Sequence, residues 1–210
     1  DRNYTIEFTK VGISLQPVHG GPVYVFRNAL FNVGKETFKL HNGPSGALLF
    51  HNTSVKAGMP WELMTGETVS NCVSRNNLFV GTAANYAFEN TAPMQGCDFD
   101  YDGFAGRWKL VLKWNGVRYT SLDDVRGSAP VYRHLVQLDA KTLFQSGLAV
   151  PDDTAKEYPC SEIDLRLSPQ GGAIDAGVGL PNVNDGFAGA APDLGAYEAG
   201  QVLPHYGPRE

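Results

Sequence analysis

The chain has 210 residues, which is enough for one large domain with a substantial buried core. Charged residues make up 19% of it, and 24 glycines and 13 prolines exclude a highly charged disordered chain and favour a turn-rich β protein over a helical bundle. The formal net charge of -5 argues against a nucleic-acid partner. No apolar run approaches the ~18 residues of a membrane span, so we expect no membrane insertion.

A repeat of about 24 residues organises the first half of the chain. Two strips of the sequence keep this period. The second strip consists of strand-like segments, with ISLQ at 13, FKLH at 38, WELM at 61 and YAFE at 86. Each copy has room for two or three short strands and none for a helix, so the period predicts a β-solenoid whose coils stack about 4.8 Å apart. The first strip consists of asparagines that follow Arg or His, spaced by 25, 24 and 24 residues: Asn3, Asn28, Asn52 and Asn76.

These asparagines are expected to be structural. A coil must turn sharply between its strands, and Asn tolerates the left-handed backbone that such turns require. Stacked in register, each Asn amide can also bond to the next, which would form a ladder along the solenoid.

The chain divides into three stretches of one all-β domain. Residues 1–106 are regular β-helix coils, and residue 1 lies in mid-coil, so missing N-terminal coils or another chain are expected to cover the first coil. Residues 107–135 are an inserted hairpin, turning at Asn115-Gly116, and a short helix capped by Ser121. Residues 136–210 are irregular terminal coils and a C-terminal cap that protects the last open edge.

Strand alternation in the second strip predicts which side chains face inward. Ile13, Leu15, Phe38, Leu40, Trp61, Leu63, Tyr86 and Phe88 point into the coil. Two outward columns remain, the first of Ser14, Lys39, Glu62 and Ala87, and the second of Gln16, His41, Met64 and Glu89.

The outward face offers the first candidate site. Lys39 or His41 is the candidate base or charge neutraliser and Glu62 the candidate acid, while Gln16, His19 and Glu89 would bind substrate. The alternative is a solvated face with a Lys39–Glu62 cross-strand pair. His19 and His41 also raise the alternative of a shared metal, although no set of carboxylates accompanies them.

A basic column offers a second candidate. Arg27, His51 and Arg75 would stack about 5 Å apart and repel one another unless an anion sits on them. Either acidic side chains of a neighbouring loop neutralise them, or Arg27 and Arg75 bind an acidic polymer.

Two further clusters follow along the chain. If Asp98, Asp100 and Asp102 lie on a strand, all three carboxylates share one face and would suit Ca²⁺ or glycoside hydrolysis; the alternative is a turn cluster. Trp108, with Trp114 and Tyr119, would either stack on a sugar or pin the inserted hairpin to the coils.

The three cysteines, Cys72, Cys97 and Cys160, are too few and too scattered for a disulfide framework. Cys72 and Cys97 lie 25 residues apart, one repeat, and are interpreted as small buried apolar residues.

The asparagine coils, followed by GGAIDAG at 171–177 and PDLGAYEAG at 192–200, resemble the right-handed parallel β-helix proteins of the pectate-lyase-like superfamily. The match departs slightly where Gln-Gly-Gly separates Ser168-Pro169 from AIDAG. The resemblance implies a secreted or periplasmic protein with a polysaccharide partner lying along a sheet face. A lyase or glycoside hydrolase is then expected, with Ca²⁺ as the only cofactor considered and none required. Because the superfamily also includes non-enzymes, a non-catalytic carbohydrate-binding, adhesin or tailspike-like β-helix is the alternative.

Overall fold

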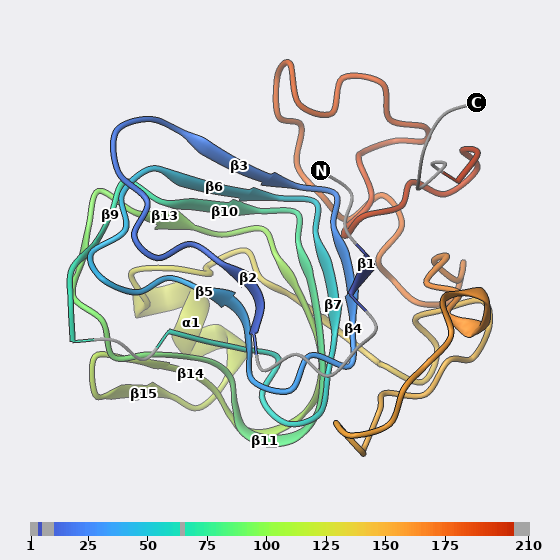
Figure 1. The fold of residues 1–210 in the computed structure, drawn as a ribbon, viewed down its shortest axis with the longest axis horizontal. Helices are drawn as coiled ribbons and strands as arrows, with labels where there is room; N and C mark the ends of the chain where they lie inside the picture. Colours follow the sequence, from blue (N-terminus) through green and yellow to red (C-terminus); the bar gives the residue numbers. More distant parts are fainter. Residues whose placement is uncertain (1–3, 6–10, 64–65, 204–210) are drawn as a thin grey trace.

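The computed structural model describes residues 4–5, 11–63 and 66–203, and it shows a parallel β-solenoid of about four turns (Figure 1). Strands of successive coils pair in parallel along most of the described chain, as in Ala29↔Thr53 and Thr53↔Leu78. The all-β parallel β-helix predicted from the repeat is therefore confirmed.

The largest sheet has eight strands in the order β1-β4-β7-β11-β14-β15, with β8 paired to β11 and β16 paired to β14. Only the β14–β15 pair is antiparallel among these. It forms the predicted hairpin, in which Asn115 and Gly116 both have positive φ (45° and 87°), as a type I′ turn requires. The strands are β1 (Tyr4–Thr5), β4 (Ala29–Phe31), β7 (Thr53–Val55), β8 (Trp61–Leu63), β11 (Leu78–Asn90), β14 (Gly103–Trp114), β15 (Val117–Tyr119) and β16 (Val136–Leu138).

Three smaller parallel sheets complete the coils. A four-stranded sheet has the order β13-β10-β6-β3, and two-stranded sheets pair β12 with β9 and β2 with β5. Their strands are β2 (Val11–Ser14), β3 (Val23–Phe26), β5 (Glu36–Lys39), β6 (Ala47–Phe50), β9 (Val69–Ser70), β10 (Val73–Arg75), β12 (Met94–Gln95) and β13 (Asp98–Phe99). The described helices are α1 (Leu122–Ser128) and the 3-10 turn η1 (Cys160–Glu162).

The predicted asparagine ladder is present, but Asn77 takes the place of Asn76, and Asp102 ends the ladder. Asn28 Nδ2 donates to Asn52 Oδ1 at 2.9 Å, Asn52 Nδ2 to Asn77 Oδ1 at 2.8 Å, and Asn77 Nδ2 to Asp102 Oδ1 at 2.9 Å. The prediction of Asn76 as a rung is wrong, because the third coil is one residue longer than the repeated Arg-Asn pair suggests. Asn3 lies outside the described residues.

The turning residue is also displaced by one position. The left-handed conformation belongs to the residue before each rung, whereas Asn28 and Asn52 have ordinary backbone. Each rung is therefore free to use its side chain for the ladder while its predecessor makes the corner. The corner residues, with φ of 52°, 51°, 57° and 56°, are Arg27, His51, Asn76 and Tyr101.

The interior of the coils is a stack of aromatic rings. Trp61 lies over Phe79 with ring centroids 4.7 Å apart and over Phe99 at 5.4 Å. Of the side chains predicted to face inward, Ile13 is only partly buried, and the others are buried: Leu15, Phe38, Leu40, Trp61, Leu63, Tyr86 and Phe88.

Helix α1 and the residues after it close the C-terminal end of this interior. Ser121 and Asp124 form a capping box at the start of α1, as predicted, and Val125 is fully buried. Tyr132 packs on Phe99 and Phe104 and donates its hydroxyl to Asp102 Oδ2 at 3.2 Å, so it terminates both the aromatic stack and the ladder. Helix α1 and Tyr132 therefore close this end of the coil interior.

The C-terminal segment lies against the outer face of the large sheet, beside β1, β4 and β7 (Figure 1). Leu194 and Ala196 are buried there in a second core with Leu78 and Val80. Hydrogen bonds add to this packing, since Ala196 N donates to Thr53 Oγ1 at 2.9 Å.

Three carboxylates hold the loops of this segment together. Asp175 accepts from Ala190 N, Asp193 from Asp175 N, and Glu198 from Asp193 N, at 2.8, 2.8 and 3.2 Å. The acidic residues of the AIDAG and PDLGAYE motifs are therefore structural: they satisfy backbone N–H groups.

Candidate functional site

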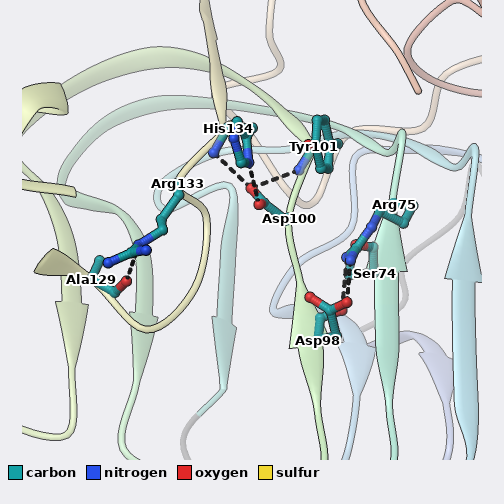
Figure 2. A network of polar contacts seen from close by, with 8 residues as sticks. All are labelled: Ser74, Arg75, Asp98, Asp100, Tyr101, Ala129, Arg133 and His134. Carbon is teal, nitrogen blue, oxygen red and sulfur yellow. Dashed lines mark hydrogen bonds and ion pairs between the residues drawn. The ribbon is translucent and has the colours of Figure 1, made fainter. Parts of the chain in front are cut away.

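The corner after β13 carries a polar cluster that faces solvent, which we call the Asp100–His134 cluster (Figure 2). It joins residues of β10, β13 and the segment after α1, which the parallel stacking brings side by side. Its members are Arg75, Asp98, Asp100, Tyr101 and His134.

Asp100 holds His134 at two points. Its Oδ2 lies 2.7 Å from His134 Nδ1, and its Oδ1 accepts the backbone N–H of His134 at 2.7 Å. Tyr101 N also donates to Asp100 Oδ1 at 3.0 Å. A carboxylate only accepts, so Nδ1 carries the proton and Nε2 is the free nitrogen of the neutral ring.

The two partners differ in their access to water. The His134 side chain is 59% exposed, whereas that of Asp100 is 15% exposed. The carboxylate is thus anchored in the corner while the imidazole presents its other nitrogen to whatever approaches.

The Tyr101 ring stacks against the His134 imidazole. The two rings are stacked with centroids 4.5 Å apart and an interplanar angle of 7°. The Arg75 guanidinium lies 5.7 Å from the centroid of the same Tyr101 ring, and Figure 2 shows the tyrosine between Arg75 and His134. Both contacts restrict the orientation of the tyrosine ring.

Arg133 precedes His134 in the chain, and its guanidinium points away from this row, towards Ala129 at the end of α1 (Figure 2). Its Nε donates to Ala129 O at 3.0 Å and its Nη2 to Gly127 O at 3.4 Å. Among the described residues its partners are these backbone carbonyls and no carboxylate, so its charge is not neutralised by an ion pair. Arg75, in contrast, is paired with Asp98.

This arrangement has the parts of a general base. Histidine is the side chain most often used for proton abstraction, and a carboxylate on Nδ1 fixes its tautomer and stabilises the imidazolium that forms. Arg133 has no carboxylate partner among the described residues, but its guanidinium would have to turn towards the imidazole to neutralise an acidic substrate.

The predicted catalytic residues Lys39, His41 and Glu62 lie elsewhere. All three are partly exposed, as an outward column requires. Within the described part of the chain, however, no hydrogen bond or ion pair joins them to one another.

The register of the outward columns differs from the prediction. Glu89 lies opposite Glu62, because β8 pairs with β11 two residues further along than expected. Glu89 also forms an ion pair with Lys113 on β14, whose Nζ lies 2.5 Å from Glu89 Oε1. Ala87, predicted to face outward, is buried.

The remaining predicted binding residues of that face sit at its first coil. Gln16 and His19 are exposed in the loop that follows β2. Met64, predicted in the same column as His41, falls outside the described residues.

The predicted basic column is wrong in one member. Arg75 lies opposite Phe50, so it is not stacked on His51, and the corner column continues from His51 to Asn76. Asp193 and Glu198 are near enough to Arg27 for its charge to lower the pKa of both carboxyls, although burial raises those pKa values by more. These contacts favour neutralisation by acidic neighbours over an anionic ligand for Arg27 and Arg75.

His51 is buried at this corner as a neutral ring. Asn76 and Asn184 both place their Nδ2 atoms on its Nε2, at 3.1 and 2.8 Å. Burial, and then the charge of Arg27, lowers the pKa of His51 to about 3.

The three aspartates do not share a face. Asp98 is exposed and paired with Arg75, Asp100 holds His134, and Asp102 is fully buried at the end of the ladder. Burial raises the pKa of Asp102 to about 7. In the described ranges no three His, Cys, Asp or Glu side chains are grouped so that they could hold a metal ion. The geometry thus gives the calcium interpretation no support.

The aromatic residues of the insertion contact the core. Trp108 and Trp114 pack against the interior cluster, and Tyr119 is buried in it. They pin the hairpin to the coils, and Trp108 is therefore placed for packing more than for stacking on a sugar.

A cavity of about 330 Å³ lies beside the corner residue Arg27, and none of the residues of the Asp100–His134 cluster line it. Arg27 and Phe26 form one wall, and the C-terminal segment forms the other with Val183, Ala196, Tyr197, Glu198, Gln201, Val202 and Leu203.

Sequence reasoning missed His134, Tyr101 and Arg133. His134 is 34 residues away from Asp100 in the chain and follows a helix, so no local spacing links the two. The available signal was the pair Tyr101-Asp102, which occupies the corner-and-rung position of an additional coil.

Comparisons of the chain with protein-family models, with curated proteins and with solved structures found no match. Among the described residues, no helix has the length and apolar character needed to cross a membrane.

Proposed function

We propose that this chain is a secreted or periplasmic β-helix of the pectate-lyase-like superfamily that cleaves a uronic-acid-containing polysaccharide by β-elimination, with His134 as the base. The observation that carries the proposal is the exposed His134 imidazole whose Nδ1 lies 2.7 Å from Asp100 Oδ2. The motifs at 171–177 and 192–200 support the superfamily.

The chemistry of the step uses three side chains. Nε2 of His134 removes the proton from the carbon that bears the uronate carboxylate, and the electron pair left behind forms a carbon–carbon double bond as the glycosidic oxygen leaves. Asp100 stabilises the resulting imidazolium through Nδ1. Arg133 would turn from the carbonyls of Ala129 and Gly127 to neutralise the substrate carboxylate, which makes its neighbouring proton more acidic.

The surroundings suit a sugar chain. The imidazole is seated on the Tyr101 ring and is 59% exposed, which leaves it open to an approaching sugar ring. An extended polymer could then continue along the coils, whose corner residues repeat at the stacking distance of about 4.8 Å.

A second candidate function is glycoside hydrolysis on the outer face of β8 and β11. Glu62 and Glu89 occupy neighbouring rungs of a parallel pair, with backbones about 4.8 Å apart. Retaining hydrolases use two carboxyls about 5 Å apart, one as nucleophile and one as acid. Glu89, which is ion-paired with Lys113, would be the nucleophile, and Glu62 would be the acid.

The test is incubation of the protein with a panel of acidic and neutral polysaccharides. Elimination produces an unsaturated uronate with ultraviolet absorbance, which the proposal predicts for an acidic polymer. New reducing ends without that absorbance would replace the proposal with hydrolysis at Glu62 and Glu89. Binding without any product would contradict both and identify a non-catalytic carbohydrate-binding, adhesin or tailspike-like protein.

A further inference from the structure

Cys72 and Cys97 occupy equivalent positions in adjacent coils. The residues that follow them, Val73 and Asp98, are paired in the parallel ladder of β10 and β13, and Asp98 N donates to Cys72 O at 2.9 Å. Parallel neighbours of this kind have Cα atoms about 4.8 Å apart, which lies inside the range of roughly 4.4–6.8 Å that a disulfide spans.

The side chains approach each other as well. Cys72 N donates to Cys97 Sγ at 3.4 Å, so the sulfur of one cysteine lies against the backbone of the other. Both contribute to the interior cluster, Cys72 as a buried member and Cys97 as a partly exposed residue packed against it. Both are free thiols in this structure.

We propose that Cys72 and Cys97 form an inter-coil disulfide by thiol–disulfide exchange with a small-molecule disulfide, and that Cys97 is the thiol that reacts with it first. The Cys97 thiolate attacks one sulfur of the small disulfide, forming a mixed disulfide and releasing one thiolate. Cys72 then loses its proton and attacks Cys97 Sγ, which displaces the second thiolate. Two protein thiols and one disulfide thus become one protein disulfide and two small thiols.

The order of attack follows from the environment of each thiol. Cys97 is partly exposed, whereas Cys72 is buried. A hydrogen bond from the Cys72 side chain lowers the pKa of Cys97 to about 7, and the same interaction, with burial, raises the pKa of Cys72. Cys97 therefore has thiolate available near neutral pH, and Cys72 is placed to resolve the mixed disulfide.

The new bond would link the coils that carry Arg75 and Asp98. Both belong to the Asp100–His134 cluster, in β10 and β13, so the link would hold two strands of that corner together. The inference does not depend on the proposed elimination reaction, because its readout is covalent.

Tryptic peptides separate the three cysteines, which makes the experiment direct. The folded protein is treated with oxidised glutathione, its free thiols are blocked, and the trypsin digest is analysed by mass spectrometry. The proposal predicts a linked pair of peptides, 57–75 with 76–107, and no glutathione retained on either. Glutathione retained on Cys97, or both thiols still free, would overturn it.

Single substitutions test the order of events. Cys72→Ser should accumulate the glutathione adduct on Cys97, whereas Cys97→Ser should leave Cys72 unmodified. Cys160, in peptide 157–166, provides the matched control, since Cys160→Ser should form the 72–97 link to the same extent as the unsubstituted chain. An adduct on Cys72 in the Cys97→Ser protein would contradict the proposed entry through Cys97.

Discussion

Two buried titratable side chains, Asp102 and His51, make the stability of the fold depend on pH in opposite directions. Burial raises the pKa of Asp102 to about 7 and lowers that of His51 to about 3. Between pH 4 and 7 the folded state holds more protons than the unfolded state at Asp102 and fewer at His51. The two effects largely cancel in the unsubstituted chain, so variants are needed to reveal them.

We expect Asp102→Asn to become more stable relative to the unsubstituted chain as pH rises. The folded-state pKa of Asp102 lies above its unfolded value of 3.8, so ionisation costs stability progressively from about pH 4 to pH 7. The neutral amide avoids this cost, worth at most about 4 kcal/mol, and can donate to the hydroxyls of Ser74 and Tyr132. Urea unfolding at pH 4 and pH 8 measures the difference; an equal effect at both would contradict it.

His51→Asn should show the opposite trend. The folded-state pKa of His51 lies below its unfolded value of 6.5, so stability is lost as pH falls from 6.5 towards 3. At pH 4 this loss amounts to roughly 3 kcal/mol and would be absent from the variant. Asn tolerates the left-handed backbone at this position, where φ is 51°. If urea unfolding shows the same loss from pH 7 to pH 4 in both proteins, His51 is not the group responsible.

At the residue scale, sequence reasoning succeeded where a residue type has one dominant use. The inward aromatic and aliphatic residues and the capping residue Ser121 belong to this class. It failed for His51, whose neutral buried state depends on Asn184, 133 residues away. A single sequence carries no local signal for such a contact.

At the scale of elements, the ladder is the feature that joins one coil to the next. Asn52 donates to Val25 O and Asn77 Oδ1, and its own Oδ1 accepts the N–H and the amide of Asn28. All of these groups are buried, so losing one rung leaves several polar atoms unsatisfied.

Asn52→Ala should therefore destabilise the fold by at least about 3 kcal/mol, since each unsatisfied buried group costs about 1–3 kcal/mol. The measurement is the free energy of unfolding in urea. Asn85→Ala is the matched control, because Asn85 is exposed on β11, and it should change stability by less than about 0.5 kcal/mol. Equal effects of the two substitutions would mean that the ladder is not a stabilising element.

We expect the N-cap of α1 to contribute less to the free energy of unfolding than a rung of the ladder does. Ser121→Ala removes the oxygen that accepts from Asp124 N, and a lost N-cap costs typically about 1 kcal/mol. Because α1 closes the interior, we expect amide hydrogen exchange to accelerate in 122–135 more than in β6. Uniform acceleration across the chain would contradict a local closing role.

Element positions were predictable from the repeat, and register was not. The Arg-Asn pairs align Asn76 with Asn52, but the strands that follow align Asn77, since Leu78, Phe79 and Val80 pair with Thr53, Ser54 and Val55. Matching the pattern of the following strand would have located the rung. A difference of one residue in coil length is decided by packing at the turns, which the period alone does not encode.

At the scale of the whole molecule, the solenoid is a short stack of about four coils whose corners and faces repeat (Figure 1). The coils explain why Arg75, Tyr101 and His134 line up, although they are far apart in sequence. The C-terminal segment covers the outer face of the large sheet and bonds to the corner column at His51 and Asn76, next to Tyr101 of the Asp100–His134 cluster. Fold class was predictable because the repeat is a property of the sequence; the site was not, because it depends on which coils meet at that corner.

The most direct test of this account is the rate of polysaccharide elimination by His134→Ala compared with His41→Ala. Loss of a general base should lower the rate by a factor of about 10²–10⁴ in His134→Ala, whereas His41→Ala should retain the rate of the unsubstituted chain. Both histidines are surface residues, so both variants should fold. Full activity in His134→Ala, or a comparable loss in His41→Ala, would contradict the assignment of the site to the Asp100–His134 cluster.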